Sequence, residues 1–241
     1  STHYIGRTSD TALRVRESQV QDLPLLSGAA FGDMIGLEVL CRVRASRKFC
    51  GRYQRGEIPK HKVLLSPGQF MQEGVKFKQP FVEFSTKWKL GGDDYLSDDA
   101  AATLTGQTAA EINEMIMLGD SVANIIDHFF WGIGFDVYDF KLEMARERGT
   151  GRLTVIDGLT LDEIVMYKDG QVYGKNSLRS YFEEHHSGWV ELLNIAKKQH
   201  PEDKNEWPSY PPLPAKLKKS HVSQYQAVAA NLSSRVEQLA A

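Results

Sequence analysis

Three charged residues alternate with apolar ones between Phe135 and Met144, in the run Phe-Asp-Val-Tyr-Asp-Phe-Lys-Leu-Glu-Met. Successive side chains of a β-strand point to opposite faces of the sheet. A strand here would place Asp139, Lys141 and Glu143 on one face and mostly apolar residues on the other. A row of acid, base and acid suits a solvated cleft that holds a metal ion and an anionic substrate.

A second strand is predicted from Arg152 to Asp157, after a loop that contains Gly149 and Gly151. If the two strands form a hairpin, Asp157 comes close to Glu143. Two carboxylates beside a lysine are typical of a site for Mg²⁺ and a nucleotide. An exposed strand face with ordinary salt bridges is the alternative, and the spacing alone favours neither interpretation.

The clearest helix of the sequence leads into this strand. Thr108-Ala-Ala-Glu111 matches a capping box, which predicts a helix start. Apolar residues then recur at intervals of three and four, and Gly132 and Gly134 are expected to end the helix. We interpret the apolar stripe as core: Ile112, Met115, Ile116, Gly119, Val122, Ala123, Ile126, Phe129 and Phe130.

The remaining elements are predicted from shorter patterns. Strands are expected over 1–5, 13–15 and 37–43, the last one half-buried because its residues alternate in polarity. Helices are expected over 177–182 and 188–200, and a closing amphipathic helix contains Tyr225 to Leu239. The segment from Arg42 to Lys62 is basic, and we interpret it as a solvated loop, although such a cluster could also bind phosphate or carboxylate.

The composition excludes several classes of protein. With 241 residues, 41% of them hydrophobic, the chain can bury a sizeable core. The formal net charge of −2 gives no support for nucleic-acid binding. Cys41 and Cys50 are too few for a disulfide framework or a cysteine-rich zinc site, which fits a cytoplasmic protein. No apolar run approaches the roughly 20 residues of a membrane span.

The strand from Val137 to Glu143 resembles the Asp-x-Lys-x-Glu signature of the SAICAR synthetase family (phosphoribosylaminoimidazole-succinocarboxamide synthase). Further motifs of the family are matched in the same order, over most of 2–165. The resemblance implies an α+β fold, namely the family's C-terminal lobe with a mainly antiparallel sheet packed with helices. The other matching segments are Thr2–Ile5, Gly36–Arg42, Phe84–Lys87 with Asp94, and Val155–Asp162.

Enzymes of this family use ATP to join L-aspartate to a carboxylate on an imidazole ribonucleotide in purine biosynthesis. The carboxylate is activated as an acyl phosphate and is then attacked by the amine. The resemblance therefore implies a ligase with ATP and Mg²⁺ as cofactors, and an amino acid and a carboxylated acceptor as substrates.

The resemblance also implies roles for individual residues. Glu143 and Asp157 would hold Mg²⁺. Lys141 would neutralise a reacting oxygen, and Asp139 would orient that lysine or bind a ribose hydroxyl. Lys87 and Lys141 would bind the nucleotide. Lys87 would also bind the substrate, together with Asp94 and Asp162. Arg42 and Ser46 would bind the substrate phosphate.

Three positions depart from the family pattern, all of them affecting the second acidic strand or the substrate phosphate. Because two of the expected phosphate contacts are missing, we expect an acceptor that lacks the 5′-phosphate or docks it on a shifted basic loop. The departures are Arg44-Ala-Ser-Arg-Lys48 in place of a Gly-Ser turn, Val165 in place of an arginine, and Asp157-Gly158 in place of Asp-Glu. Ser46 could replace the serine of the Gly-Ser turn only if the loop is one residue shorter.

The resemblance begins where the family's N-terminal lobe ends, so we expect that lobe in a preceding segment or another chain. We divide the chain into a substrate and metal lobe over 1–200, a Pro-rich connector over 201–216, and a helix over 217–241 that packs on the same lobe. The alternative function is a non-catalytic binding or interaction protein that keeps this fold.

Overall fold

The structure, a computed structural model, describes residues 2, 4–9, 12–15, 34–87, 94–147, 149–201 and 203–240. Contacts divide the chain into two compact units. Unit 1 comprises 1–89, 93–124 and 140–159, and unit 2 comprises 90–92, 125–139 and 160–241. The predicted boundary near residue 200 lies inside unit 2, so the division into lobe, connector and helix remains a prediction.

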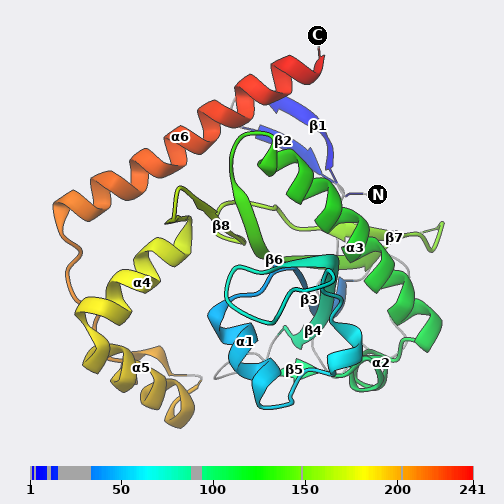
Figure 1. The fold of residues 1–241 in the computed structure, drawn as a ribbon, viewed down its shortest axis with the longest axis horizontal. Coiled ribbons are helices and arrows are strands. Elements are labelled where there is room, and N and C mark those ends of the chain that lie inside the picture. The colour runs from blue at the N-terminus through cyan, green and yellow to red at the C-terminus, as the bar shows by residue number, and fades with distance from the viewer. Residues whose placement is uncertain are drawn as a thin grey trace. The chain divides into compact units, whose positions relative to one another are not determined.

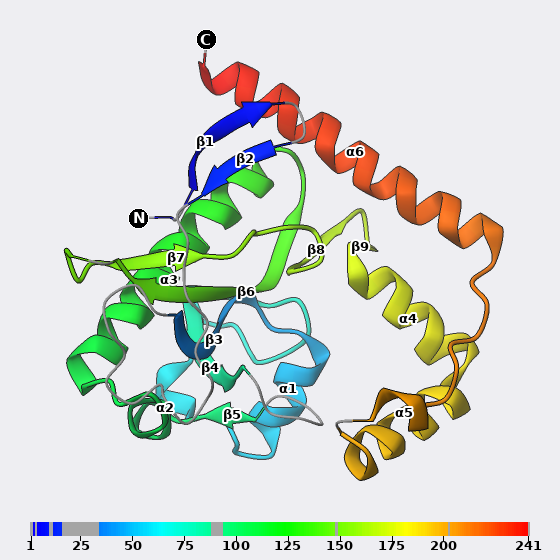
Figure 2. The same cartoon turned by 180° about the vertical axis from the view of Figure 1, so that it is seen from behind.

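Unit 1 is built on a sheet in which strands far apart in sequence are neighbours (Figures 1 and 2). Its order is β5-β4-β3-β6, and β7 pairs with β6. The pairs β3–β4, β4–β5 and β6–β7 are antiparallel, as expected for this fold class. The strands are β3 (Met34–Arg44), β4 (Lys76–Thr86), β5 (Tyr95–Leu96), β6 (Asp136–Arg146) and β7 (Leu153–Ile156).

Strand β3 is buried on both faces, so the prediction of a half-buried strand was wrong. On one face Leu37, Val39 and Cys41 have no exposed surface, and on the other Arg42 is only 5% exposed. The reason is the position of β3 between β4 and β6, with the helix that contains Gly119 packed against Cys41. Polarity alternates along the strand, but the polar residues are paired and not solvated.

Helix α3 (Ala109–Trp131) forms where the capping box predicts it. The Thr108 amide donates to Glu111 Oε2 at 2.8 Å, and the Glu111 amide donates back to Thr108 Oγ1 at 3.2 Å. In unit 1 the helix packs closely on the sheet, since a Cβ on Gly119 would lie 3.2 Å from Val82 and 3.3 Å from Cys41 Sγ. Gly134, with a φ of 82°, follows the helix end, which confirms the predicted stop.

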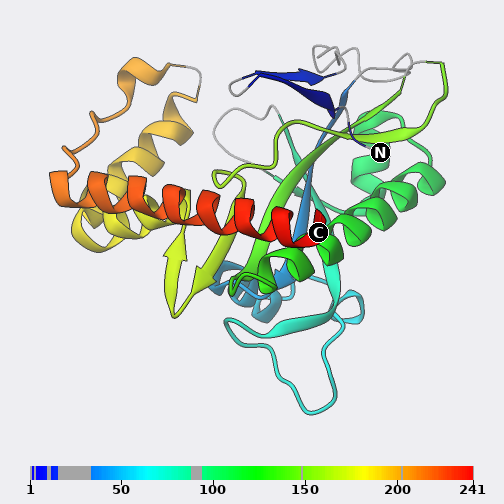
Figure 3. The same cartoon turned by 90° about the horizontal axis from the view of Figure 1, so that it is seen from above.

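The basic segment contains a helix, α1 (Arg47–Gln54), so the prediction of a loop over 42–62 was wrong. Ser46 caps it by accepting from the Phe49 amide at 3.3 Å. Phe49 packs against Phe77 and Phe81 with ring centroids 5.2 Å apart in each pair, and this burial stabilises a short helix that has three charged residues. Two short helices, η2 (Lys60–Lys62) and α2 (Asp98–Thr105), also belong to unit 1, and a long loop between η2 and β4 extends beyond the sheet (Figure 3).

The strands predicted near the N-terminus pair with each other. Strands β1 (Tyr4–Ser9) and β2 (Ala12–Val15) form an antiparallel two-stranded sheet (Figure 2). The first strand extends beyond its predicted range, and the second agrees with the prediction to within a residue.

Unit 2 contains the start of β6, an antiparallel hairpin and the C-terminal helices. Strands β8 (Ile164–Lys168) and β9 (Gln171–Tyr173) turn at Asp169 and Gly170, both with positive φ. The predicted helices are confirmed. The first and the last are longer than expected, and the one predicted over 188–200 agrees to within one residue at each end. Over the described residues, no helix is long and apolar enough to cross a membrane. The helices are α4 (Lys175–His185), α5 (Ser187–Gln199), η3 (Lys204–Glu206) and α6 (Ala215–Ala240).

Candidate active site

Strand β6 has the alternation that its sequence predicts. Phe140, Leu142 and Met144 are at most 4% exposed. Lys141 and Glu143 lie on the other face and remain partly exposed, with side-chain exposures of 30% and 14%. Asp139 is also partly exposed, on the same strand. The polar face is therefore accessible to a ligand.

Lys141 is held by a residue that was not assigned to the site from the sequence. Its ammonium group donates to Glu38 Oε2 on β3, and the Ser85 hydroxyl on β4 donates to the same oxygen at 3.1 Å. Glu38 and Ser85 lie directly opposite each other in the β3–β4 register. Three neighbouring strands thus contribute to the position of one lysine.

A second ion pair lies two residues further along β6. The Lys87 ammonium, just after β4, donates to Glu143 Oε1. Lys87 is 27% exposed and Glu143 is 14% exposed. Two lysines and two glutamates thus form a pair of salt bridges, with both ammonium groups partly open to solvent. Such groups can bind a polyphosphate, because an incoming anion can share them with the carboxylates.

The predicted hairpin of β6 and β7 is present, with Gly149 and Gly151 both at positive φ. Its register pairs Glu143 with Ile156, so Asp157 lies one residue beyond the position opposite Glu143. Asp157 has a φ of 69°, which ends the strand alternation, and its Oδ1 accepts from the Gly158 amide at 2.7 Å.

The donor types at this end of the hairpin fit Mg²⁺, which prefers hard carboxylate oxygens. No group of three or more His, Cys, Asp or Glu residues that could hold a metal occurs in the described part of the chain. That does not argue against Mg²⁺ with a nucleotide, since one or two carboxylates commonly suffice when phosphates complete the shell. The metal role of Glu143 and Asp157 remains a prediction.

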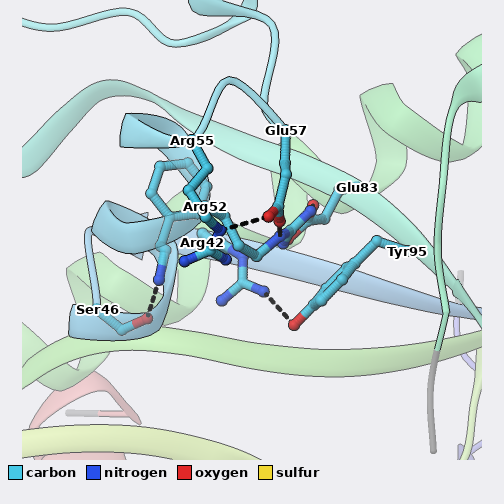
Figure 4. Close-up of polar contacts among 8 residues, drawn as sticks. Arg42, Ser46, Arg52, Arg55, Glu57, Glu83 and Tyr95 are labelled. Carbon is cyan, nitrogen blue, oxygen red and sulfur yellow. Dashed lines mark hydrogen bonds and ion pairs between the residues drawn. The ribbon is translucent and has the colours of Figure 1, made fainter.

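Arg42 lies in a buried ionic network on the β3–β4 part of the sheet (Figure 4). Its Nε donates to Glu83 Oε1 at 2.6 Å, and its Nη2 contacts the Tyr95 hydroxyl at 3.4 Å. Arg52 of α1 grips the same Glu83 through two bonds of 2.9 Å each. The Arg52 guanidinium also lies 3.3 Å from the centre of the Tyr95 ring. Arg42 is therefore oriented by protein groups on several sides, and its phosphate role remains a prediction.

The start of α1 positions the other basic candidates differently. Ser46 is the N-cap of the helix, so its hydroxyl oxygen is used by the Phe49 amide. Arg47 is 90% exposed and pairs with Glu73 at 3.3 Å. Lys48 lies 5.4 Å from the centre of the Tyr95 ring. Lys48 and Arg42 thus both contact Tyr95.

Asp94 returns to the end of β4, next to Lys87. The Thr86 amide donates to the Asp94 carbonyl at 3.0 Å, and the Asp94 amide donates to Thr86 Oγ1 at 3.1 Å. The predicted pairing of Lys87 and Asp94 in one substrate segment is thus compatible with the backbone, while the role of Asp94 stays a prediction.

In unit 2, Asp162 precedes β8, and Val165 lies on that strand at 9% exposure. The position where the family pattern has an arginine is therefore part of the core and is filled by a small apolar side chain.

Cys41, in unit 1, contributes no nucleophile, because complete burial raises the pKa of its thiol far above the usual range.

Sequence reasoning missed Glu38, Ser85 and Glu83. Glu38 stands on the polar side of an alternating strand, and Glu83 and Ser85 alternate around Phe84 in the same way. The period of two would have grouped them, but the order of strands that joins them to Lys141 and Arg42 is not visible in the sequence.

A family model described as SAICAR synthetase matches residues 2–195, which is most of the chain. The chain belongs to the SAICAR synthetase family. A phosphoribosylaminoimidazole-succinocarboxamide synthase of Shouchella clausii is 26% identical over 195 residues, which cover 80% of this chain and 69% of that enzyme. The SAICAR synthetases are ATP-dependent ligases of purine biosynthesis.

Solved structures agree on the fold. A SAICAR synthetase in complex with ADP aligns with a TM-score of 0.56 and 20% identity, over 87% of this chain and 74% of that one. The Saccharomyces cerevisiae SAICAR synthase complexed with SAICAR aligns with a TM-score of 0.60 and 18% identity, over 83% of this chain and 61% of that one. These similarities confirm the α+β fold class.

Proposed function

We propose that this SAICAR synthetase family protein is an ATP-dependent ligase that joins an amino acid, L-aspartate in the first instance, to a carboxylated imidazole ribonucleotide or a related acceptor. The observation that carries the proposal is the pairing of Lys141 with Glu38 and of Lys87 with Glu143 on one accessible face of the sheet. The ammonium groups of Lys141 and Lys87 lie there with the Asp-x-Lys-x-Glu motif, and such cations are needed to bind a polyphosphate substrate.

The reaction proceeds in two steps. A carboxylate oxygen of the acceptor attacks the γ-phosphorus of ATP, the bond to the bridging oxygen breaks, and ADP leaves. The amino group then attacks the acyl carbon, loses a proton, and expels phosphate as the amide bond forms. Negative charge develops on phosphoryl oxygens in the first step, and nearby ammonium groups stabilise it.

Each residue of the face has a role in this proposal. Lys141 neutralises a reacting oxygen, and Asp139 orients it or accepts a bond from a ribose hydroxyl. Lys87 binds nucleotide phosphate. Glu143 and Asp157 would hold Mg²⁺, which supplies Lewis-acid neutralisation of the phosphates when bound. An ion bound to Glu143 would release Lys87 from that carboxylate for the nucleotide.

The residues proposed for acceptor binding are Arg42, Asp94 and Ser46 in unit 1 and, as a separate proposal, Asp162 in unit 2. Because Val165 is core and the Ser46 hydroxyl caps α1, an acceptor phosphate would depend on Arg42 and the cations of α1. We therefore propose that the acceptor either lacks the 5′-phosphate or docks it against Arg47 and Lys48. Losing two charge-assisted bonds of roughly 1.5–3 kcal/mol each would otherwise weaken binding by about two to four orders of magnitude.

The proposed function is tested by measuring ADP formation that depends on both the acceptor and L-aspartate. Lys141→Ala should lower kcat by roughly 100-fold or more, as removal of one charge-stabilising donor does in other enzymes. Lys219→Ala, an exposed lysine of α6, is the matched control and should leave the rate unchanged. Equal rates in wild type and Lys141→Ala would contradict the proposal.

A second assay addresses the acceptor phosphate. Phosphorylated and dephosphorylated acceptors are compared in wild type and in Arg47→Ala/Lys48→Ala. Normal activity of the double variant on the phosphorylated acceptor would contradict the proposal that the phosphate docks on α1. Ligand binding without amide formation for every acceptor would instead favour a non-catalytic binding protein with this fold.

A further inference from the structure

Helix α6 turns one face toward the rest of unit 2. On this face Val228 is fully buried and Gln224 is 9% exposed. His221 and Tyr225 lie on the same face, because they are separated from these residues by three or four positions of the helix. The contacts of this face are specific. His221 Nδ1 lies 3.0 Å from the Ser177 hydroxyl of α4, and the Gln224 amide group donates to the Val172 carbonyl of β9 at 3.2 Å. The rotation of α6 about its axis is thereby fixed.

Tyr225, on the same face, reaches Asp162. Its hydroxyl donates to Asp162 Oδ1 at 2.5 Å, a length typical of a charge-assisted bond to a carboxylate. The Tyr225 ring lies 4.9 Å from the His221 ring, which holds the phenol from the side. Partial burial and the carboxylate acceptor together raise the pKa of the Tyr225 hydroxyl well above its ordinary value, so it stays a donor.

The backbone that carries Asp162 is fixed independently. The Asp162 amide donates to Thr160 Oγ1 at 3.2 Å, and the Glu163 amide donates to the Thr160 carbonyl at 2.9 Å. Gly174 lies against this turn so closely that a Cβ there would sit 2.3 Å from the Leu161 carbonyl oxygen. The main chain is thus held by the turn and by Gly174, while the carboxyl group is held by Tyr225.

We propose that Tyr225 is a positioning residue, which orients the Asp162 carboxylate so that its second oxygen accepts a hydrogen bond from a hydroxyl or ammonium group of the acceptor substrate. An ionised carboxylate has acceptors on both oxygens, and a donor on Oδ1 fixes the direction of Oδ2. The inference rests on the proposed function, in which Asp162 contacts substrate. In this inference α6, which lies beyond the residues 2–195 that match the family model, contributes to binding of that substrate.

The activity test is Tyr225→Phe, which removes the hydroxyl and keeps the ring. We expect KM for the acceptor to rise about tenfold, as the loss of one charge-assisted bond would produce, while KM for ATP stays unchanged. Tyr210→Phe is the matched control, because Tyr210 is 66% exposed and contacts its neighbours through its ring. A merely structural hydroxyl would change the thermal midpoint and leave the ratio of the two KM values unaltered.

The contact itself is tested without any substrate. The NMR chemical shift of the Tyr225 ring carbon bonded to oxygen is compared at neutral pH in wild type and in Asp162→Asn. We expect the signal to move, because the hydroxyl loses its charged acceptor. Identical chemical shifts would overturn the inference, whatever the activity of the protein.

The remaining outcomes separate the inference from the function on which it rests. An active wild type with an unchanged acceptor KM in Tyr225→Phe would overturn the inference alone. A wild type that shows the tyrosine shift but forms no amide with any acceptor would overturn the proposed function, and the substrate contact of Asp162 with it.

Discussion

Lys141 gains its position from Glu38, a carboxylate about a hundred residues earlier in the chain that also accepts a bond from Ser85. A lysine held in this way loses little side-chain freedom when a phosphate arrives, which lowers the entropic cost of binding. Glu38 therefore belongs to the site as a positioning residue, next to the groups that would contact substrate.

Replacing Glu38 tests this role. Glu38→Gln keeps the size of the side chain and removes its charge, so Lys141 loses its ionic partner while the sheet is retained. We expect kcat to fall about tenfold or more, with a small change in stability because the pair is partly exposed. Ser85→Ala, which removes only the hydroxyl, should have a smaller effect. A variant Glu38→Gln with wild-type kcat would contradict a positioning role.

Glu83 gives a prediction about stability. It is 7% exposed and accepts bonds from two arginines, so its removal would leave Arg42 and Arg52 without that buried counter-charge. Breaking a buried ion pair costs about 3–5 kcal/mol. Urea unfolding of Glu83→Gln should show a loss of this order.

The control for Glu83 is Glu73, whose side chain is 45% exposed and which pairs with the exposed Arg47 at 3.3 Å. Glu73→Gln should lower the urea midpoint far less than Glu83→Gln, because solvent screens an exposed pair. If the two variants unfold at the same urea concentration, the network around Arg42 does not stabilise the fold as argued.

Residue types in β6 could be predicted because alternation is local. The period of two grouped Lys141 with Glu143 correctly, and both lie on the accessible face. Their partners could not be predicted, since Glu38 and Lys87 meet them only through the order of strands in the sheet. Asp157 shows the limit of the pattern, because a single positive φ ends the alternation that places it.

Helix α3 was predictable, and α1 was not, for reasons that lie in the elements themselves. A long helix carries a capping box, an apolar stripe and a glycine stop, all local signals. Helix α1 has only eight residues, most of them polar or charged, and its stability comes from Phe49 in a core formed with β4. Short helices of this kind depend on tertiary packing.

The capping box allows an element-scale test. Thr108→Ala removes the acceptor for the Glu111 amide, and we expect a loss of about 0.5–2 kcal/mol in the free energy of unfolding. Thr103→Ala is the control, since the Thr103 hydroxyl donates to a carbonyl of its own helix, Asp99, and caps nothing. Equal stabilities of the two variants would mean that the box does not stabilise α3.

The box also has a pH dependence. Hydrogen bonds from the Thr108 amide and hydroxyl lower the pKa of Glu111 below its ordinary value. A carboxyl with a lowered folded-state pKa contributes stability above its unfolded pKa, and this is lost as pH falls through the folded value. The stability difference between wild type and Glu111→Gln should therefore shrink toward low pH, as thermal unfolding at several pH values would show.

At the scale of the whole molecule, the family similarity covers residues 2–195 and the two units share α3 and β6 along the chain. The polar faces of β3 and β4 and the part of β6 with Lys141 and Glu143 belong to unit 1, and the Asp162–Tyr225 contact belongs to unit 2. Composition and motif order sufficed to predict the fold class and the family. The division into units did not follow from any linker in the sequence.

The central claim is that the protein makes an amide through an acyl phosphate, and the most direct test follows an oxygen atom. The full protein is incubated with ATP, L-aspartate and a carboxylated imidazole ribonucleotide whose carboxylate carries oxygen-18. We predict that one of the two labelled oxygens appears in the inorganic phosphate and the other stays in the amide. Label in AMP, or phosphate that carries no label, would contradict the claim.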